Sequence, residues 1–374
     1  MKIIISPDSF KGSISSADAC EVIKRSILEL EADADIVCVP IADGGEETLD
    51  ALVPVERQKR TEVTGPLFEK VSAVYGYTDN MAIIEMAVAA GLTLIPESRR
   101  KAADTTTYGV GELILDAIGN GYKKIMLTVG GSATNDGGCG MLAALGAKFF
   151  DGDGNSFVPT GGTLKDIARI DISGVRRELY DCEFFIATDV KNPLVGELGA
   201  TNIYAPQKGA TAEELSSMEN GMSHYAALLK ELSGKDVATV EGAGAGGGVS
   251  VPLIALFRHR IRSGIDTVLD SAEFDLLLSG ADAVITGEGR IDTQSLFGKA
   301  ISGVTRRANA AGVPVYCFVG GIGSDKSELL KMGIEDIYDI ASLARSLDDA
   351  MSNASGYLFD IAKRFLEEVR KNEK

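Results

Sequence analysis

Histidine, paired cysteines and long apolar runs are scarce in this sequence, and each scarcity bears on the class of protein. Only two histidines occur, His224 and His259, which excludes a histidine-rich metal site, and we expect each of them to be structural. The five cysteines form no CxxC pair, and their odd number argues against a complete disulfide framework and favours the reducing cytoplasm. No run of 18 apolar residues is present and the apolar segment at residues 1–6 is short, so we expect neither a membrane span nor an export signal.

Positive charge is also in short supply. The sequence has 37 Lys plus Arg residues against 54 Asp plus Glu, a formal net charge of −17. Such a field repels nucleic acid and anionic membrane surfaces, so we expect neither as a partner. It also repels anionic substrates, so an enzyme that uses them needs basic residues, helix N-termini or a metal ion at its site. The few basic residues in loops are therefore informative.

The 374 residues, 45% of them apolar, are enough for about two domains. Apolar runs alternate with helical patterns at both ends of the chain, which is typical of a parallel α/β sheet. The expected elements are strands at 2–5, 36–42, 283–287, 313–319 and 336–342, with helices after residue 15, near 299–311 and at the C-terminus.

Between these ends the pattern changes. Residues 61–86 read as short strands joined by turns, which suits antiparallel or mixed pairing, and a helix near 109–118 and a strand at 123–129 follow. We therefore predict an α/β protein in which a Rossmann-like parallel-sheet domain is interrupted by a second, mixed-sheet α/β domain. The predicted bounds are 1–62 plus 271–374 for the first domain and 63–270 for the inserted one.

Two polar loops follow the first two expected strands. In PDSFKGS, Lys11 lies between a strand and a helix N-terminus, where it can meet a bound anion, although a capped turn with an exposed lysine explains the loop equally well. In ADGGEET, acidic residues flank a glycine pair, which suits Mg²⁺ or hydroxyl binding, and a tight solvated turn explains it almost as well. The candidate residues are Asp8, Ser9, Lys11 and Ser13 in the first loop and Asp43, Gly44, Gly45 and Glu46 in the second.

Two further groups of loops fall in the inserted region. GGSATNDGG at 130–138 has four glycines, more than a simple connector needs, and it offers hydrogen-bond donors and a carboxylate to a bound anion. TDVKNP at 188–193 and APQKGA at 205–210, taken alone, are ordinary turn sequences. The candidates here are Ser132, Asn135, Asp136, Asp189, Asn192 and Lys208.

The fifth loop, TGEGRIDTQSLFGKA at 286–300, is the densest in charge. It follows an apolar strand, and charges of both signs alternate with glycines at the expected C-terminal edge of the sheet, where α/β proteins bind ligands. Its candidates are Glu288, Arg290, Asp292, Gln294 and Lys299. Carboxylates for Mg²⁺, cations for phosphate and glycine-freed N–H groups are the inventory that phosphoryl transfer requires.

Familiar nucleotide motifs are absent or weak. The sequence has no GxxxxGK[ST] P-loop and neither the HRD nor the DFG signature of protein kinases. Gly242, Gly244 and Gly247 satisfy GxGxxG, and Asp266 follows near the spacing of a dinucleotide fingerprint, which would suit an NAD-dependent dehydrogenase of a small hydroxy acid. We discount this alternative because the preceding segment is a poor buried strand and so glycine-rich a window meets the pattern easily.

Taken together and in order, the loops resemble a known family. The motifs that carry the resemblance are PDSFKGS, ADGGEET, EMAVAAGLTLIP, TTTYGVGELI, VGGSATNDGGCGMLAALGAKF, DVKNPL, APQKGA, GAGAGGG and TGEGRIDTQSLFGKA. They are similar to those of the bacterial type 1 glycerate kinases and cover nearly the whole chain. The resemblance implies a cytoplasmic enzyme of two α/β domains, with its active site in the cleft between them. It also implies transfer of the ATP γ-phosphoryl group to D-glycerate with Mg²⁺, in many members at the 2-hydroxyl, which gives 2-phosphoglycerate.

The chain departs from the family pattern only slightly, with Glu47 where the family often has glycine and Thr188 where it often has cysteine. A non-catalytic hydroxy-acid binding protein remains a third alternative, and the sequence leaves open whether the chain forms a homo-oligomer.

Physical reasoning assigns the roles of the residues within this resemblance. We expect Lys11, with Lys299 or Arg290, on phosphate, and Asp43 or Asp189 near the substrate hydroxyl or on Mg²⁺. Ser9, Asn135 and Asp136 are expected to position ligands. The other expected substrate or nucleotide contacts are Asp8, Ser13, Gly44, Gly45, Glu46, Thr106, Ser132, Asn192, Lys208, Glu288, Asp292 and Gln294.

Overall fold

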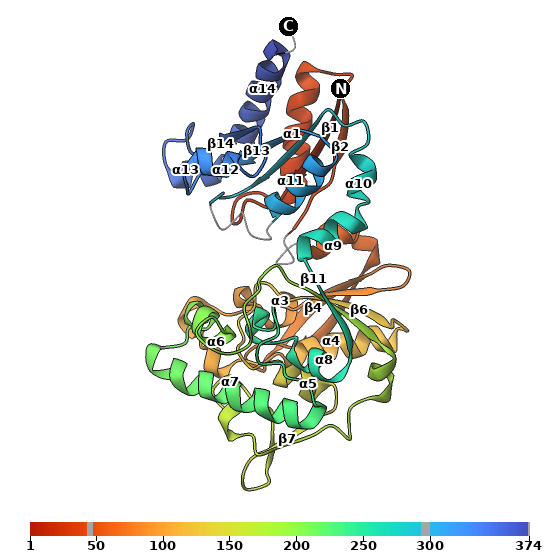
Figure 1. Cartoon of the computed structure of the whole chain (residues 1–374), viewed down its shortest axis with the longest axis vertical. Helices are drawn as coiled ribbons and strands as arrows, with labels where there is room; N and C mark the ends of the chain where they lie inside the picture. The colour runs from red at the N-terminus through yellow and green to blue at the C-terminus, as the bar shows by residue number, and fades with distance from the viewer. Residues whose placement is uncertain (43–47, 293–299, 373–374) are drawn as a thin grey trace. The chain divides into compact units, whose positions relative to one another are not determined.

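The computed structural model describes residues 1–42, 48–292 and 300–372, and the chain divides into two compact units (Figure 1). The terminal unit comprises Met1–Asp43, Asp50–Leu52 and Ser263–Lys374. The inserted unit comprises Gly44–Leu49 and Val53–Arg262. Each unit has its own sheet and its own apolar core.

The terminal unit contains a five-stranded sheet in which every neighbouring pair is parallel. Its strands are β1 (Lys2–Pro7), β2 (Asp35–Cys38), β12 (Ala283–Glu288), β13 (Val315–Val319) and β14 (Asp336–Asp339). They lie in the order β14-β13-β12-β1-β2. Numbered within the unit, this is the flavodoxin-like order 2-1-3-4-5, whose direction reverses between β1 and β12.

Helices cover both faces of this sheet. Ile3 and Ile5 of β1 belong to one core cluster with apolar residues of α1 (Ser16–Leu30) and α14 (Ala354–Asn372). Ile4 points to the opposite face and belongs to a cluster with residues of α9, α10 and α11. The bounds of these three helices are α9 (Gly264–Ser271), α10 (Phe274–Leu277) and α11 (Ala300–Ala310), and the unit also contains α12 (Lys326–Leu330) and α13 (Leu347–Ser352). Burial on both faces explains why the strand is a continuous apolar run.

The inserted unit contains a mixed six-stranded sheet in the order β11-β10-β6-β5-β4-β3. The pairs β3–β4 and β4–β5 are antiparallel, and the other three pairs are parallel. The strands are β3 (Gln58–Thr64), β4 (Lys70–Tyr77), β5 (Ala82–Glu85), β6 (Lys124–Thr128), β10 (Glu183–Ala187) and β11 (Arg258–Arg262). A small antiparallel sheet adds β7 (Lys148–Phe150), β8 (Ser156–Phe157) and β9 (Arg169–Asp171).

The helices of this region are short apart from two. They are α3 (Ala87–Ala90), α4 (Tyr108–Gly119), α5 (Cys139–Ala144), α6 (Ala200–Tyr204), α7 (Ala212–Ser233) and α8 (Val251–Leu256). Helix α2 (Thr48–Leu52) is divided between the units, with Thr48 and Leu49 in the inserted unit and Asp50–Leu52 in the terminal unit. The longest, α7, begins at a capping box in which Thr211 accepts from the amide of Glu214 and the Glu214 carboxylate accepts from the amide of Thr211. None of the helices that the structure describes is long and apolar enough to cross a bilayer.

The predicted fold class is confirmed, because a parallel sheet built from the two ends of the chain is interrupted by a mixed α/β insertion. The expected helix after residue 15 is also present as α1, and it begins at a cap in which the Ser15 hydroxyl accepts from the amide of Asp18 at 3.1 Å. Strands β10 and β11 and helix α7 were not predicted. Strand β11 has the sequence RHRIR, in which charged residues alternate with half-buried ones, as suits the edge of a sheet.

An aromatic cluster fastens α14 to the sheet of the terminal unit. The ring of Phe365, which is 1% exposed, lies 4.7 Å from that of Tyr316, 5.7 Å from Phe318 and 6.1 Å from Tyr338, measured between centroids. All three pairs meet edge to face, the arrangement that aromatic quadrupoles favour.

Replacing Phe365 by alanine should lower the free energy of unfolding by about 3–5 kcal/mol, because the change leaves a cavity in a fully packed cluster. The matched control is Phe359→Ala on the same helix, where the ring is half-buried beneath the cations of Arg25 and Lys363 and a smaller loss is expected. Urea unfolding followed by circular dichroism measures both. Equal losses would show that the cluster does not anchor the helix.

Candidate active site

The carboxyl ends of β1 and β12 bring the first and fifth predicted loops together. The two strands pair in register from Ile3 with Ala283 to Pro7 with Gly287. One further bond, from the amide of Asp8 to the carbonyl of Gly287 at 2.8 Å, continues the pairing into the loops. This edge lies where the strand order reverses, the usual position of a ligand site in an open α/β sheet.

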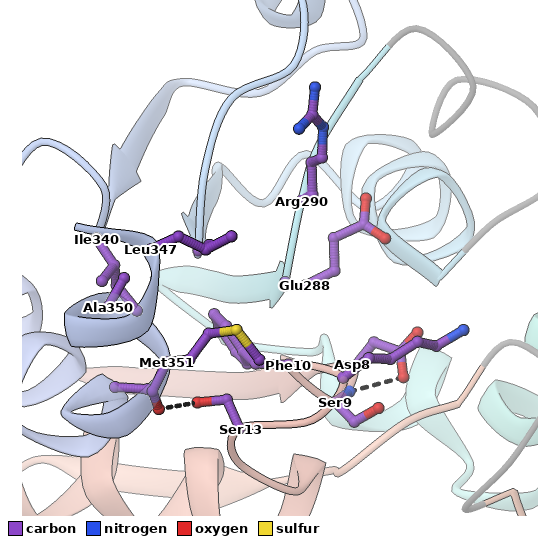
Figure 2. A pocket seen from close by; sticks show the side chains of 14 residues that line it. Asp8, Ser9, Phe10, Ser13, Glu288, Arg290, Ile340, Leu347, Ala350 and Met351 are labelled. Atoms are coloured by element: carbon purple, nitrogen blue, oxygen red, sulfur yellow. Dashed lines mark hydrogen bonds between the residues drawn. The ribbon is translucent and has the colours of Figure 1, made fainter. Parts of the chain in front are cut away.

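A cavity of about 330 Å³ lies at this edge (Figure 2). Six side chains predicted from the sequence line it: Asp8, Ser9, Lys11, Ser13, Glu288 and Arg290. Asp8 and Ser9 are buried, Glu288 is half-buried, and Lys11 and Arg290 are exposed. The structure thus brings carboxylates and cations from opposite ends of the chain into one cavity.

The first loop is a tight turn that presents Lys11. The amides of Ser13 and Ile14 both donate to the carbonyl of Phe10, at 2.8 and 3.2 Å, and the amide of Phe10 donates to the carbonyl of Ile14 at 2.9 Å. Asp8 folds back on the start of the turn, where its Oδ1 accepts from the amide of Ser9 at 2.7 Å. These bonds fix the backbone, so the exposed lysine projects from a rigid base.

The fifth loop rests on a glycine-rich segment that the sequence analysis missed. The amide of Gly320 donates to the carbonyl of Glu288 at 3.1 Å, and the amide of Ile291 donates to the carbonyl of Gly321 at 3.0 Å. A Cβ on Gly320 would overlap the carbonyl oxygen of Gly289, so only glycine permits this close approach. The available signal was the glycine pair directly after the apolar strand at 313–319.

Part of the predicted site lies outside the described residues. This applies to Asp43, Gly44, Gly45, Glu46, Gln294 and Lys299. Asp292, another candidate of the fifth loop, is described and is half-buried.

In the inserted unit, Asp136 organises the glycine-rich loop that was the third candidate. Its carboxylate accepts four hydrogen bonds, from the amide and hydroxyl of Thr107 and from the amides of Gly138 and Gly140, at 2.8–3.1 Å. Burial raises the pKa of Asp136, while the donated hydrogen bonds act in the opposite direction. These contacts fix the loop against the start of helix α4, which is how Asp136 can position other groups.

Lys208 lies buried against the same loop. Its ammonium donates to the hydroxyl of Ser132 at 2.6 Å and to the carbonyl of Thr134 at 2.8 Å. Burial lowers the pKa of Lys208 to about 7, and the negative charge of Asp136 opposes that shift. The segment APQKGA, which read as an ordinary turn, therefore supplies a buried cation to the third loop.

Two buried oxygens beside Lys208 have no hydrogen-bond partner among the described residues, Thr134 Oγ1 and Asn135 Oδ1. The amide nitrogen of Asn135 donates to the hydroxyl of Thr201 at 3.0 Å. Most buried polar atoms in folded proteins are paired, so the hydroxyl of Thr134 and the amide oxygen of Asn135 are groups to which a further polar partner could bond.

The other candidates of the inserted unit lie on neighbouring segments of that unit. The amide nitrogen of Asn192 donates to the carbonyl of Leu198 at 2.8 Å, and its oxygen accepts from the hydroxyl of Tyr204 at 2.7 Å. The hydroxyl of Thr106 accepts from the amide of Tyr108, and Asp189 is half-buried after β10.

Each histidine contacts a backbone carbonyl, as expected for a structural residue. His224 Nε2 lies 2.7 Å from the carbonyl oxygen of Ile167, and His259 Nδ1 lies 3.2 Å from that of Phe257.

The GxGxxG match is not a dinucleotide fingerprint. No strand directly precedes it, and Gly247 packs so closely on Thr134 that a Cβ would overlap the carbonyl oxygen of that residue. Asp266, the expected ribose ligand, lies in the other unit and pairs with Arg306 and Arg307. The glycines serve close loop packing instead.

Lys208→Met should change how stability depends on pH. The folded-state pKa of Lys208, about 7, lies below its ordinary value of 10.5, so between these values the unfolded chain binds the extra proton. This lysine therefore contributes a rise in the free energy of unfolding as pH increases from about 7, at up to about 1.4 kcal/mol per pH unit. In urea unfolding at pH 7, 8 and 9, the free energy of unfolding of the wild type should rise relative to that of the methionine variant. Parallel dependences of the two free energies on pH would refute the depressed pKa.

Comparison with known proteins places this geometry in a family. The model of the glycerate kinase family matches residues 3–370. A glycerate kinase of Bacillus subtilis (strain 168) is 41% identical, covering 99% of this chain and 98% of its own, and a glycerate 2-kinase of Escherichia coli (strain K12) is 42% identical, covering 95% and 94%. A crystal structure from Salmonella typhimurium LT2, provisionally assigned as glycerate kinase 2, superposes with a TM-score of 0.85 at 38% identity over 100% of this chain and 99% of that one. This chain therefore belongs to the glycerate kinase family and is an ATP-dependent kinase.

Proposed function

We propose that this kinase transfers the γ-phosphoryl group of ATP to the 2-hydroxyl of D-glycerate and forms 2-phosphoglycerate, with Mg²⁺ as the cofactor. One observation carries the proposal: loops from opposite ends of the chain place carboxylates and cations in a single cavity at the switch point of a parallel sheet. The name of the Escherichia coli relative, a glycerate 2-kinase, supports the choice of hydroxyl.

The proposal includes a two-domain organisation. The first domain comprises residues 1–62 plus 271–374, the inserted domain comprises 63–270, and the active site lies in the cleft between them. A cleft of this kind excludes water from the transferring group, which otherwise consumes ATP by hydrolysis.

Each group in the proposed site has a specific task. Lys11 and Arg290, with Lys299, hold the phosphate oxygens and offset the charge that spreads over them in the transition state. Ser9, Asn135 and Asp136 position the ligands. A carboxylate, Asp43 or Asp189, accepts the proton of the attacking hydroxyl, since the acceptor must lie within hydrogen-bond reach of that hydroxyl.

The described residues have oxygen donors suited to Mg²⁺. No group of three His, Cys, Asp or Glu side chains gathers as a metal cluster among them, but kinases commonly hold Mg²⁺ with one or two carboxylates and complete the shell with phosphates and water. Asp8 and Glu288 line the cavity as two such carboxylates, and Asp43 and Asp189 are the ligands expected from the sequence. When bound, the ion neutralises phosphate charge.

Partners and compartment follow the same proposal. ATP and D-glycerate are the small-molecule partners, the cytoplasm is the compartment, and neither nucleic acid nor a membrane is required. The proposal holds equally for a monomer and for a homo-oligomer.

Phosphorus NMR of the purified protein with ATP, Mg²⁺ and D-glycerate should show the 2-phosphate signal growing as the γ-phosphate signal declines. Chelation with excess EDTA should stop the reaction, and added Mg²⁺ should restore it. A 3-phosphate signal would overturn the regiochemistry, turnover that survives EDTA would overturn the metal requirement, and no ATP-dependent product would overturn the function.

Lys11→Ala should lower kcat by about 10² or more, because it removes a cation from the charge that develops on the phosphoryl group. Lys11→Arg, which keeps the charge, should retain more activity than the alanine variant. The control is Lys331→Ala, directly after α12, where a surface ion pair with Glu328 is lost without effect on the rate. Steady-state kinetics with saturating substrates measure kcat for each variant. An unchanged kcat for Lys11→Ala would show that this lysine serves only the structure of the turn.

A further inference from the structure

The cavity at the end of β1 and β12 has two chemically different sides. Figure 2 shows Ile340, Leu347, Ala350 and Met351 on the left and Asp8, Ser9 and Glu288 on the right. We call the first side the apolar wall, formed by Phe10, Ile340, Leu347, Ala350, Met351 and Ala354. None of these six residues was among the predicted site residues.

Two residues of the apolar wall expose large hydrophobic side chains. Leu347 and Met351, both on α13, are 74% and 39% exposed, whereas Phe10 and Ile340 beneath them are 3% and 1% exposed. Single exposed leucines are common on protein surfaces. These two differ because they continue a buried apolar surface outward along one side of a cavity, which is how proteins present a face to a flat apolar ligand.

The size and chemistry of the cavity select between the two substrates of the proposed reaction. Glycerate has three carbons and carries a carboxylate and two hydroxyls, so contact with the apolar wall would leave its polar groups unpaired at a cost in free energy. A cavity of about 330 Å³ is also far larger than such an acid needs. A purine ring has a broad apolar face, and burying that face against aliphatic side chains is favourable.

The charges on the other side fit the rest of a nucleotide. Lys11 and Arg290 supply cations for phosphates, and Asp8 and Glu288 supply oxygen donors for a metal that accompanies them. We propose that the apolar wall binds the adenine ring of ATP, with Leu347 and Met351 against its face, and that the phosphates extend toward Lys11 and Arg290. This assignment rests on the proposed kinase function and leaves glycerate to groups outside the apolar wall.

The apolar wall and the phosphate side are mechanically joined. The hydroxyl of Ser13, in the same turn as Lys11, donates to the backbone carbonyl of Met351 at 2.5 Å. Helix α13 in turn begins at Ser346, whose hydroxyl accepts from the amide of Asp349 at 3.1 Å. The spacing between the base and the phosphates is therefore held by protein contacts before the nucleotide arrives, which lowers the entropy lost on binding.

The test is to place a negative charge on the apolar wall without disturbing the fold. Leu347→Glu changes an exposed side chain at the start of α13 and should raise both the KM for ATP and the Kd for β,γ-imido-ATP by about tenfold or more, because contact is lost and the charge repels the nucleotide. Leu347→Met, which keeps an apolar contact, should remain near wild type. The matched control is Leu276→Glu on α10, where a leucine of 70% exposure lies outside the cavity lining.

The proposal predicts that the KM for D-glycerate stays within about twofold in all three variants. Calorimetric titration with the imido analogue and Mg²⁺, in the absence of glycerate, separates this assignment from the proposed function. Turnover with an unchanged nucleotide Kd in Leu347→Glu would overturn the adenine site and leave the kinase function standing. Loss of analogue affinity in that variant alone, in a protein that never phosphorylates glycerate, would support the nucleotide site and overturn the function. A selective rise in the KM for glycerate would assign the wall to the acid and overturn the proposal.

Discussion

The parallel pairing of β1 with β12 is the contact on which the candidate site depends. Only this pairing brings the PDSFKGS loop beside the TGEGR segment, because parallel neighbours end at the same edge of a sheet. Both faces of β1 are buried: Ile3 and Ile5 pack toward α1 and α14, while Ile4 packs toward α9, α10 and α11. The register pairs Pro7 with Gly287, so the next residues along the two strands, Asp8 and Glu288, follow at the same edge. The pairing of the two strands thus determines the spacing of groups that belong to the site.

Much of the fold could be predicted because its central strands are buried on both sides. β1, β6, β12 and β13 appear in the sequence as continuous apolar runs, and the short turns between β3, β4 and β5 indicated antiparallel or mixed pairing. Strand β11 was not predicted, because an edge strand needs few apolar residues. Its arginines lie at its exposed positions. Helix α7 carried a detectable signal in the capping box at Thr211 and Glu214, which stands directly before the helix.

The candidate site, like the fold, could be predicted only in part from the sequence. Charges that follow a buried strand are conspicuous in a sequence, so Asp8, Lys11, Glu288 and Arg290 could be named before their shared cavity was seen. The apolar wall could not, because Leu347 and Met351 look like any amphipathic helix until the fold brings that helix beside Phe10. Lys208 was named as a candidate, but its segment was interpreted as an ordinary turn and its burial was not predicted. Burial of a cation arises from packing that the local sequence does not encode.

The discontinuity of the terminal unit has a consequence for how the protein is made. During synthesis β1 and β2 leave the ribosome first, but β12, the central partner of β1, begins only at Ala283. The inserted unit ends at Arg262, so all of its strands are available earlier. Domains generally fold as units once their residues have emerged, so the inserted unit can fold before the terminal sheet does. The terminal sheet cannot form its central pair until β12 has been synthesised.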